Sequence, residues 1–569
     1  MWSQARSALE RYFGYDDFRP GQREAILSVL RGRDTLIVMP TGGGKSLCYQ
    51  IPALVLPGLT LVVSPLIALM LDQVAALERR GIAAALINSS LSGAEIDERL
   101  ARAVTGELKL LYVAPERFGS QVFLRALREM EINLVAVDEA HCVSEWGHDF
   151  RPAYLELRKI WPEIGRPQLL ALTATATPEV RGDIVDELDL REARVLVRGF
   201  DRPNLRLSVQ REEKLTEKGR LLVSILDGSG ASAVVYASTR KVVEAATELL
   251  RSAGVDAAAY HAGLPTGRRA RVQEEWTSGR LPVVVATNAF GMGIDKEDVR
   301  RVVHFQMPGS LEAYYQEAGR AGRDGEPADC LLLHSYGDRF IHEFFIRSSY
   351  PPQKVVRAVF RALQAAVRSF GGPAMPAQFA HRVTGAKSEA EIHSALRILR
   401  DAGAVKDTAA RSSCTVRWIA SPAQVRDLIE RESGGRDPPE VLPVLAGLAR
   451  ASAQGERRQF RLSRREIARW AGGDFATARA ALDALQQAGI LGWRDDSLRS
   501  GYVPSDLKLA VEALPVDWER VAARRALEIQ KLRRMERYAY QGGCRRRYLL
   551  RYFGEHLGRS RCGGCDRCG

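Results

Sequence analysis

The sequence predicts an α/β protein in which two lobes, each built on a doubly wound parallel sheet, precede winged-helix and helical domains. Three observations predict this fold class. Short, continuously apolar runs alternate with helical stretches over the first part of the chain, as is typical of parallel strands buried on both faces. A polar stretch follows the carboxyl end of each run. Further along, the pattern changes to helix, turn, helix and hairpin.

The expected strands form two series. The first series lies at Thr35–Met39, Leu59–Val63, Leu108–Val113, Leu134–Val137 and Leu169–Leu172. The second lies at Ala233–Tyr236, Ala257–Tyr260, Val283–Ala286, Val302–Phe305 and Cys330–Leu333. Turn residues cluster between the two series, which predicts one lobe over residues 1–200 and another over residues 201–345. Because ligands bind beyond the carboxyl ends of parallel strands, we expect the polar stretches to share one cleft.

Residues 350–430 and 440–510 are each predicted to form a winged helix. A weak internal repeat relates Ser388–Lys406 to Asp474–Gly492. Each copy follows a short helical segment and precedes an expected two-stranded wing, near residues 409–413 and 495–500 respectively. One irregular helical domain is the alternative.

The charge of the chain favours a polyanionic partner. The formal net charge is +13, and residues 515–569, predicted to form a helical metal-binding module, carry 14 basic and 6 acidic side chains. Basic segments bind polyanions through the release of counterions, although a solvated, arginine-rich face is the alternative. The sequence has neither a run long enough for a transmembrane helix nor a secretion signal, so we expect no membrane association.

A glycine-rich loop, PTGGGKS, follows the first apolar run. Its glycines let backbone N–H groups approach phosphates, Lys45 supplies a positive charge and Ser46 can ligate Mg²⁺. The predicted nucleotide-binding residues of this loop are Thr41, Gly42, Gly43, Gly44, Lys45 and Ser46. A glycine turn with only a structural role is the alternative.

Two adjacent acids and a later arginine pair are the candidate catalytic groups. Asp138 can hold Mg²⁺ through water at the end of a strand, and Glu139 can orient or deprotonate the attacking water. If their segment is helical, Gln316, Arg320 and Arg323 share one stripe, and the arginines can stabilise charge on the γ-phosphate. A solvated turn and exposed arginines are the respective alternatives.

Several segments resemble the RecQ family of superfamily 2 DNA helicases. In chain order they include FGYDDFRPGQREAI, MPTGGGKSLCYQIPAL, VVSPLIALMLDQV, VDEAHCVSEWGHDFRPAY, ATNAFGMGIDKEDVRRVVHF and SLEAYYQEAGRAGRDG. The resemblance covers residues 1 to about 340 and implies two RecA-like lobes and a motor that uses ATP and Mg²⁺. It also implies that Gln22 reads the adenine edge, with Tyr15 and Arg19 packed on the adenine faces.

The resemblance implies a partner and a biological setting as well. The expected substrate is DNA, single-stranded and as fork or overhang duplexes, with 3′ to 5′ movement in repair, recombination or replication. Repair proteins and single-strand-binding proteins would be its protein partners. The expected location is the cytoplasm, near the nucleoid, in a bacterium, or the nucleus in a eukaryote.

The loop Ser144–Pro152 resembles the family's aromatic-rich loop, which senses single-stranded DNA. Bases stack on aromatic rings whatever their sequence, for about 1–3 kcal/mol each. We therefore expect Trp146 and Phe150 to engage DNA and Arg151 to meet a phosphate. The alternative is that Trp146 fills the core, because tryptophan is usually well buried.

Four cysteines close the chain with the spacing C-x17-C-x2-C-x2-C: Cys544, Cys562, Cys565 and Cys568. Four thiolates favour tetrahedral Zn²⁺, although the overlapping C-x2-C steps also suit an iron–sulfur cluster. The resemblance to the family's zinc module favours zinc. Between the cysteines, RRRY and RYF place cations beside aromatic rings and predict a surface for the DNA backbone.

The order of the domains departs from that of better-known family members. In those, the zinc module follows the helicase core and a winged helix follows the zinc module. Here both winged-helix candidates come before the cysteines. The family's strand-separating hairpin is therefore not carried over to this chain.

Two other functions stay open. The letters DEAH also occur in RNA helicases, and a comparison of ATPase stimulation by DNA and by RNA would separate the two. The other is a DNA-binding scaffold that does not hydrolyse ATP. The intact set of Lys45, Asp138, Glu139, Arg320 and Arg323 argues against a scaffold.

Overall fold

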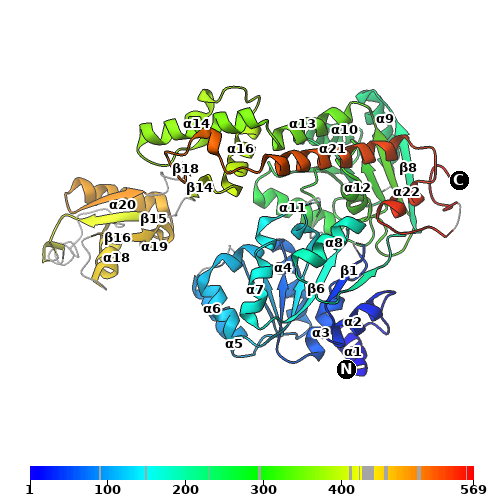
Figure 1. Cartoon of the computed structure of the whole chain (residues 1–569), viewed down its shortest axis with the longest axis horizontal. Helices are drawn as coiled ribbons and strands as arrows, with labels where there is room; N and C mark the ends of the chain where they lie inside the picture. The colour runs from blue at the N-terminus through cyan, green and yellow to red at the C-terminus, as the bar shows by residue number, and fades with distance from the viewer. Residues whose placement is uncertain are drawn as a thin grey trace. The chain divides into compact units, whose positions relative to one another are not determined.

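The computed structural model of the chain contains two compact units (Figure 1). One comprises Met1–Glu343 together with Ala526–Gly569, and the other comprises Phe344–Arg525. The structure describes all residues except 41, 89, 90, 92, 146, 148, 149, 229, 292–295, 409–412, 422, 426–440, 454–458, 496–500, 559 and 560. Within the described part of the chain, every helix is too short or too polar to cross a lipid bilayer.

The first lobe contains a seven-stranded parallel sheet with the order β3-β4-β2-β5-β6-β1-β7. Its strands are β1 (Thr35–Val38), β2 (Leu59–Val63), β3 (Ala84–Ile87), β4 (Leu110–Val113), β5 (Ile132–Val137), β6 (Gln168–Thr173) and β7 (Arg194–Val197). Adjacent residues of β1 pack into different cores, because Leu36 and Val38 belong to one apolar cluster and Ile37 to another. This two-sided burial explains the continuously apolar runs.

Helices join the strands of the first lobe and cover both faces of its sheet. They are α1 (Trp2–Ala8), α2 (Gln22–Leu30), α3 (Leu47–Val55), α4 (Ile67–Arg79), α5 (Gly93–Val104), α6 (Gln121–Glu129), α7 (Leu157–Ile160) and α8 (Pro178–Glu187). Because all paired strands are parallel, their carboxyl ends lie at one edge of the sheet. The polar segments that follow the strands therefore share that edge.

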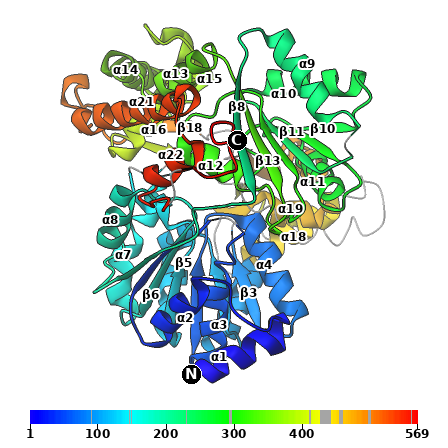
Figure 2. The ribbon, with the colours of Figure 1, turned by 90° about the vertical axis from the view of Figure 1, so that its right-hand side faces the viewer.

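The second lobe repeats this plan with a six-stranded parallel sheet in the order β10-β11-β9-β12-β13-β8 (Figure 2). Its strands are β8 (Leu205–Arg211), β9 (Ala233–Tyr236), β10 (Ala257–Tyr260), β11 (Val283–Ala286), β12 (Arg301–His304) and β13 (Ala328–His334). Its helices are α9 (Leu215–Leu226), α10 (Arg240–Ser252), α11 (Thr266–Thr277) and α12 (Leu311–Ala318). Both predicted strand series are confirmed, while β3, β7 and β8 were not predicted.

Three helices complete the chain around the second lobe and the C-terminus: α13 (Asp338–Ser349), α21 (Trp518–Tyr540) and α22 (Arg545–Tyr552). The end of the chain lies beside β8, where Leu207 and Cys565 form an isolated parallel bridge (Figures 1 and 2). The cysteine-rich segment is thereby part of the same compact unit as the two lobes.

The second unit contains two helical groups with separate apolar cores. The first group consists of α14 (Gln353–Phe370), α15 (Pro376–Phe379), α16 (Glu389–Asp401), β14 (Val405–Thr408) and β18 (Gly501–Pro504). The second consists of α18 (Val441–Ala453), α19 (Arg464–Trp470), α20 (Phe475–Gln487), β15 (Ser413–Trp418), β16 (Gln459–Ser463) and β17 (Leu491–Asp495).

The strands of the second unit pair differently from the expected wings. We expected β14 to pair with β15, and β17 with β18, as two successive hairpins. Instead β14 pairs with β18, and β15 pairs with both β16 and β17, always antiparallel. The second group is therefore inserted between the two paired strands of the first group. The expected wing tips lie mostly outside the described residues.

Candidate nucleotide-binding and metal-binding sites

A cleft of about 1040 Å³ lies at the carboxyl ends of both sheets in the first unit. The predicted site residues that line it are Tyr15, Arg19, Gln22, Gly42, Gly44, Lys45, Ser46, Asp138, Glu139, Gln316, Arg320 and Arg323. The first nine come from the first lobe and the last three from the second. The structure therefore brings together most of the nucleotide-site residues that the sequence predicted.

The glycine-rich loop joins β1 to α3, and two of its glycines adopt positive φ angles. Gly42 has φ +81° and Gly44 has φ +73°, values at which a side chain would be strained. Lys45 donates from Nζ to the carbonyls of Met39 at 3.1 Å and Pro40 at 3.3 Å. Burial lowers the pKa of Lys45 from its ordinary value. The predicted residue Thr41 lies outside the described residues.

The predicted adenine-reading residues lie against the glycine-rich loop. Gln22 is buried, and its Nε2 donates to the carbonyls of Gly43 at 3.3 Å and Gly44 at 3.0 Å. Arg19 donates from Nη1 to the carbonyl of Gly42 at 2.7 Å, while its backbone N–H donates to Gln22 Oε1 at 2.8 Å. Tyr15 is half-exposed at the rim of the cleft. The residues predicted to read the base are thus hydrogen-bonded to the loop predicted to bind the phosphates.

The two adjacent acids follow β5 and have different environments. Burial, reinforced by the charge of Glu139, raises the pKa of Asp138 to about 7. Burial also favours the neutral form of Glu139. The hydrogen bond and charge of His141, together with the charge of Lys45, outweigh burial and hold the pKa of Glu139 below its ordinary value. At neutral pH, Glu139 is therefore the stronger candidate for an ionised group facing an attacking water.

His141 is a functional candidate that the sequence analysis did not single out. Its Nδ1 lies 3.3 Å from Glu139 Oε2 and 2.9 Å from Thr173 Oγ1. Burial disfavours its charged form, but contacts with Cys142 and Glu139 raise the pKa of His141 to about 10. The letters DEAH contained the only sequence signal for it. Its contact with Thr173, at the end of β6, comes from the sheet topology.

The arginines reach the cleft from a turn, so the condition for one helical stripe, a helix that continues through Arg323, is not met. Helix α12 ends at Ala318, and Gly322 adopts φ +54° in the turn that follows. Arg320 is 5% exposed and lines the cleft with Gln316 and Arg323. A side chain at Gly42 would meet Arg323 at 3.1 Å. Arg323 of the second lobe therefore approaches the glycine-rich loop of the first.

The aromatic-rich loop is described only in part, because Trp146 lies outside the described residues. Phe150 is half-buried. Arg151 donates from Nη1 to the carbonyl of Pro65 at 3.2 Å, and its backbone N–H donates to the carbonyl of Cys142 at 2.9 Å. The loop is thereby attached to the segments that follow β2 and β5.

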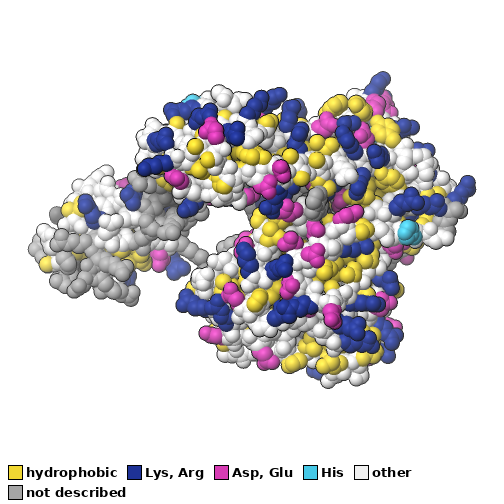
Figure 3. All heavy atoms as spheres, viewed as in Figure 1, with side chains coloured by type: hydrophobic (Ala, Val, Ile, Leu, Met, Phe, Trp, Pro, Cys, Tyr) yellow, Lys and Arg dark blue, Asp and Glu magenta, His cyan; other side chains and the backbone are white. Residues whose placement is uncertain are grey.

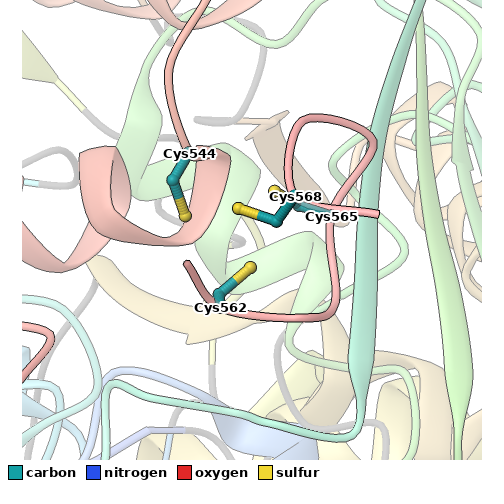
Figure 4. Close-up of side chains that lie close together, drawn as sticks. All are labelled: Cys544, Cys562, Cys565 and Cys568. Atoms are coloured by element: carbon teal, nitrogen blue, oxygen red, sulfur yellow. The ribbon is translucent and has the colours of Figure 1, made fainter. Parts of the chain in front are cut away.

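The four C-terminal cysteines converge on one point. Their sulfur atoms lie within 4.8 Å of one another, with Cys544 preceding α22 and the other three in the terminal loop (Figure 4). A tetrahedral ion with metal–sulfur distances of about 2.3 Å needs sulfurs roughly 3.8 Å apart. An iron–sulfur cluster contains several iron and sulfide atoms, so the cysteine sulfurs around it lie further apart than those around a single ion. The donor set therefore fits one zinc ion.

The expected DNA-backbone surface beside the cysteines is only partly exposed. On the face shown in Figure 3, Lys and Arg side chains are interspersed with acidic ones. Arg545 is fully buried and Arg546 is 3% exposed, whereas Arg547 and Arg551 are exposed. The prediction that the RRRY segment as a whole faces DNA is therefore wrong, because two of its three cations are used inside the protein.

Three protein families match separate parts of the chain. The DEAD/DEAH box helicase family matches residues 19–183, the helicase conserved C-terminal domain matches residues 217–325, and the RecQ zinc-binding family matches residues 506–569. The probable ATP-dependent DNA helicase RecS of Bacillus subtilis (strain 168) is 41% identical over 367 residues, 64% of this chain and 73% of that protein. The chain belongs to the RecQ family.

Other comparisons define how far this relation extends. The ATP-dependent DNA helicase RecQ of Bacillus subtilis (strain 168) is 48% identical over 357 residues, 62% of this chain and 60% of that protein. The chain thus spans less than two thirds of that RecQ relative. The crystal structure of the DUF1998 helicase MrfA bound to DNA matches with a TM-score of 0.50 and 20% identity, covering 60% of this chain and 53% of the other. That likeness shows the fold alone.

Membership of the RecQ family indicates two kinds of site in this chain, one for ATP and one for zinc. A RecQ-family chain combines an ATP-binding helicase core with a zinc-binding module. The match to the zinc-binding family agrees with the four converging cysteines and decides for zinc over an iron–sulfur cluster.

Proposed function

We propose that this protein is an ATP-dependent DNA helicase that moves 3′ to 5′ on single-stranded DNA and separates fork and overhang duplexes in repair and recombination. The observation that carries the proposal is a single cleft that collects Lys45, Asp138 and Glu139 from one lobe and Arg320 and Arg323 from the other. Relatives named ATP-dependent DNA helicases support DNA as the polynucleotide.

The proposed hydrolysis uses groups from both lobes. Lys45 and the backbone of the glycine-rich loop bind the phosphates. Glu139, whose pKa is held low, accepts a hydrogen bond from the attacking water and orients it. Arg320 and Arg323 stabilise the charge that develops on the γ-phosphate, an effect of about 10³–10⁵ in rate for comparable arginines.

The remaining nucleotide contacts follow from the same cleft. Ser46 and Asp138 would hold Mg²⁺, which neutralises phosphate charge when it is bound. Gln22 would read the adenine edge between Tyr15 and Arg19. Because Gln22 also bonds to the carbonyls of the glycine-rich loop, base recognition would fix the loop as well.

The proposed DNA contacts use the aromatic-rich loop and the C-terminal domains. Trp146 and Phe150 would stack on bases, and Arg151 would meet a phosphate once it leaves Pro65. Each separated base-pair step costs about 1.4 kcal/mol on average. The two groups of the second unit are proposed as winged-helix domains in place of the expected ranges 350–430 and 440–510, because β15 belongs to the second group and β18 to the first. Repair proteins and single-strand-binding proteins are the proposed protein partners.

A strand-separation assay tests the proposal. The wild-type protein should unwind forks and 3′ overhangs when ATP and Mg²⁺ are present, and Lys45→Ala should abolish both phosphate release and unwinding. Lys159→Ala, on an exposed lysine of the same lobe, is the matched control. Phosphate release that rises with RNA and not with DNA would favour an RNA helicase. Absence of phosphate release from the wild-type protein would favour a scaffold.

A further inference from the structure

The start of α22 is built into the connection between the two lobes. We call residues 201–205 the interlobe linker. Arg546, almost fully buried, donates to Asp201 Oδ1 at 2.8 Å, to the carbonyl of Arg202, and to the carbonyls of Pro203 at 3.5 Å and Leu205 at 2.6 Å. A buried guanidinium that bonds mostly to backbone carbonyls fixes the path of that backbone.

The cysteine-rich loop is attached to the continuation of the same linker. Leu207 of β8 donates its N–H to the carbonyl of Gly564 at 3.0 Å and accepts from the N–H of Asp566 at 3.0 Å. The Arg545 guanidinium donates from Nε to Asp566 Oδ1 at 3.0 Å and from Nη2 to Asp566 Oδ2 at 3.2 Å. Because Arg545 directly follows Cys544, the metal ligands and the interlobe linker belong to one bonded network.

Arg202 extends this network to the nucleotide cleft. We call residues 319–324 the arginine turn, since it carries Arg320 and Arg323. The guanidinium of Arg202 donates to the carbonyls of Gly319 at 3.2 Å, Ala321 at 2.9 Å and Gly322 at 2.7 Å. A side chain that holds the backbone on both sides of Arg320 determines the direction in which Arg320 points.

A second linker side chain tightens the arginine turn. Asn204 donates from Nδ2 to the carbonyls of Gly322 at 2.8 Å and Glu326 at 2.9 Å. A side chain at Gly322 would meet that same Nδ2 at 2.5 Å. The turn therefore has no room to shift unless the linker shifts with it.

We propose that Arg546 and Arg202 are positioning residues that act in series: the zinc-binding module fixes the interlobe linker, and the linker aims Arg320 and Arg323 at the γ-phosphate. The inference rests on the proposed ATP hydrolysis and deepens it. Neither Arg202 nor Arg546 is among the described residues that line the cleft, so both act through the backbone. A misplacement of about 1 Å can cost roughly a hundredfold in rate.

Binding of ADP and of ADP with aluminium fluoride separates positioning from general damage. The fluoride complex occupies the place of the transferring γ-phosphate and needs the arginines, whereas ADP does not. For Arg202→Met we expect unchanged ADP affinity. Affinity for the fluoride complex and kcat should both fall by about ten- to a hundredfold. Arg202→Lys, which keeps a donor beside the carbonyls, should recover part of the loss.

Two further variants complete the test. Arg206→Met removes an exposed arginine from β8 in the same segment and should change neither affinity. Arg546→Met should repeat the selective loss for the fluoride complex; because Arg546 also contacts the ligand Cys562, the variant is compared with the wild-type protein at equal zinc content, measured by metal analysis. If Arg202→Met does not fold, Arg202→Lys and Arg546→Met decide the question.

The inference is overturned if ADP and its fluoride complex weaken equally, or if the fluoride complex binds the arginine variants as tightly as the wild-type protein. A loss of DNA affinity alone in Arg546→Met would assign that residue to DNA binding instead. Failure of the proposed function looks different. In that case the wild-type protein itself would release no phosphate and would bind the fluoride complex no more tightly than ADP.

Discussion

At the scale of single residues, the contact between Glu139 and His141 accompanies an uncommon backbone conformation in the nucleotide cleft. Glu139 adopts φ +47°, a left-handed conformation that is uncommon for a residue with a side chain. This conformation accompanies the 3.3 Å contact between its carboxylate and His141. Local backbone strain at an active site is held in place by such surrounding contacts.

The pH dependence of hydrolysis tests this residue pair. Glu139 must be ionised to orient water, so kcat falls as the pH falls through its pKa. His141 holds that pKa below its ordinary value. The acid limb that Glu139 contributes should therefore lie at lower pH in the wild-type protein than in His141→Gln, because the substitution removes the hydrogen bond and charge that hold this pKa down.

The measurement is kcat for phosphate release as a function of pH, from acid to neutral pH. His393→Gln, on an exposed histidine, is the control. Superimposable profiles for wild-type protein and His141→Gln would show that His141 does not set the protonation of Glu139.

Single residues were largely predictable where chemistry restricts the choice. Lys45, Asp138 and Arg320 stand in patterns that few structural roles explain, and the structure brings them to one cleft. Arg202 and His141 were not predicted as functional. Their partners, the carbonyls of the arginine turn and Thr173, become neighbours only through the fold.

At the level of elements, the unpredicted strands β3, β7 and β8 are all edge strands of their sheets. Position at an edge is not sufficient as a reason, because β10 is also an edge strand and was predicted. β7 and β8 are exposed at several positions and lack a continuously apolar run, whereas β3 is buried at every position like the predicted strands. The internal strands were predictable because burial on both faces leaves a plain sequence signal.

The pairing of the wings was beyond local sequence reasoning for a different reason. The repeat correctly placed α16 and α20, but β14 pairs with β18, which follows roughly 90 residues later. Nothing in a local repeat indicates that one copy interrupts the other.

Helix α21 contacts the aromatic-rich loop. Lys531 is 4% exposed and donates to the carbonyl of Gly147 at 2.8 Å and to Glu528 at 3.0 Å. We predict that Lys531→Met reduces DNA-stimulated ATP hydrolysis more than hydrolysis without DNA, as Trp146→Ala should. The reason is that the loop loses its attachment to α21.

The measurement is phosphate release titrated with single-stranded DNA, and Arg533→Met, an exposed cation of the same helix, is the control. An unchanged ratio of stimulated to unstimulated rates in Lys531→Met would contradict a role for this contact.

At the scale of the whole molecule, the zinc-binding module joins regions that are distant in sequence. Phe553, just after α22, stacks on Phe200 with ring centroids 4.6 Å apart and contacts Tyr315 of α12 at 4.9 Å. Its carbonyl accepts from Arg181 of α8. The segment that follows α22 therefore contacts both lobes at their junction.

Removal of the metal should consequently affect more than the terminal loop. We predict that Cys562→Ser loses zinc and lowers the thermal unfolding temperature of the protein, because metal binding contributes to folding free energy. Zinc content and unfolding temperature are measured on the same sample, with Arg561→Ser, on the exposed residue that precedes Cys562, as the comparison. A zinc-free variant with the wild-type unfolding temperature would contradict the module's proposed role in joining the lobes.

In the proposed mechanism, groups from both lobes hydrolyse ATP in one cleft. The most direct measurement is nucleotide affinity and single-turnover phosphate release for the wild-type protein and Arg320→Ala, both with saturating single-stranded DNA. For Arg320→Ala we predict nearly unchanged ADP affinity and phosphate release slower by about 10³-fold or more. Equal release rates for the two proteins would contradict it.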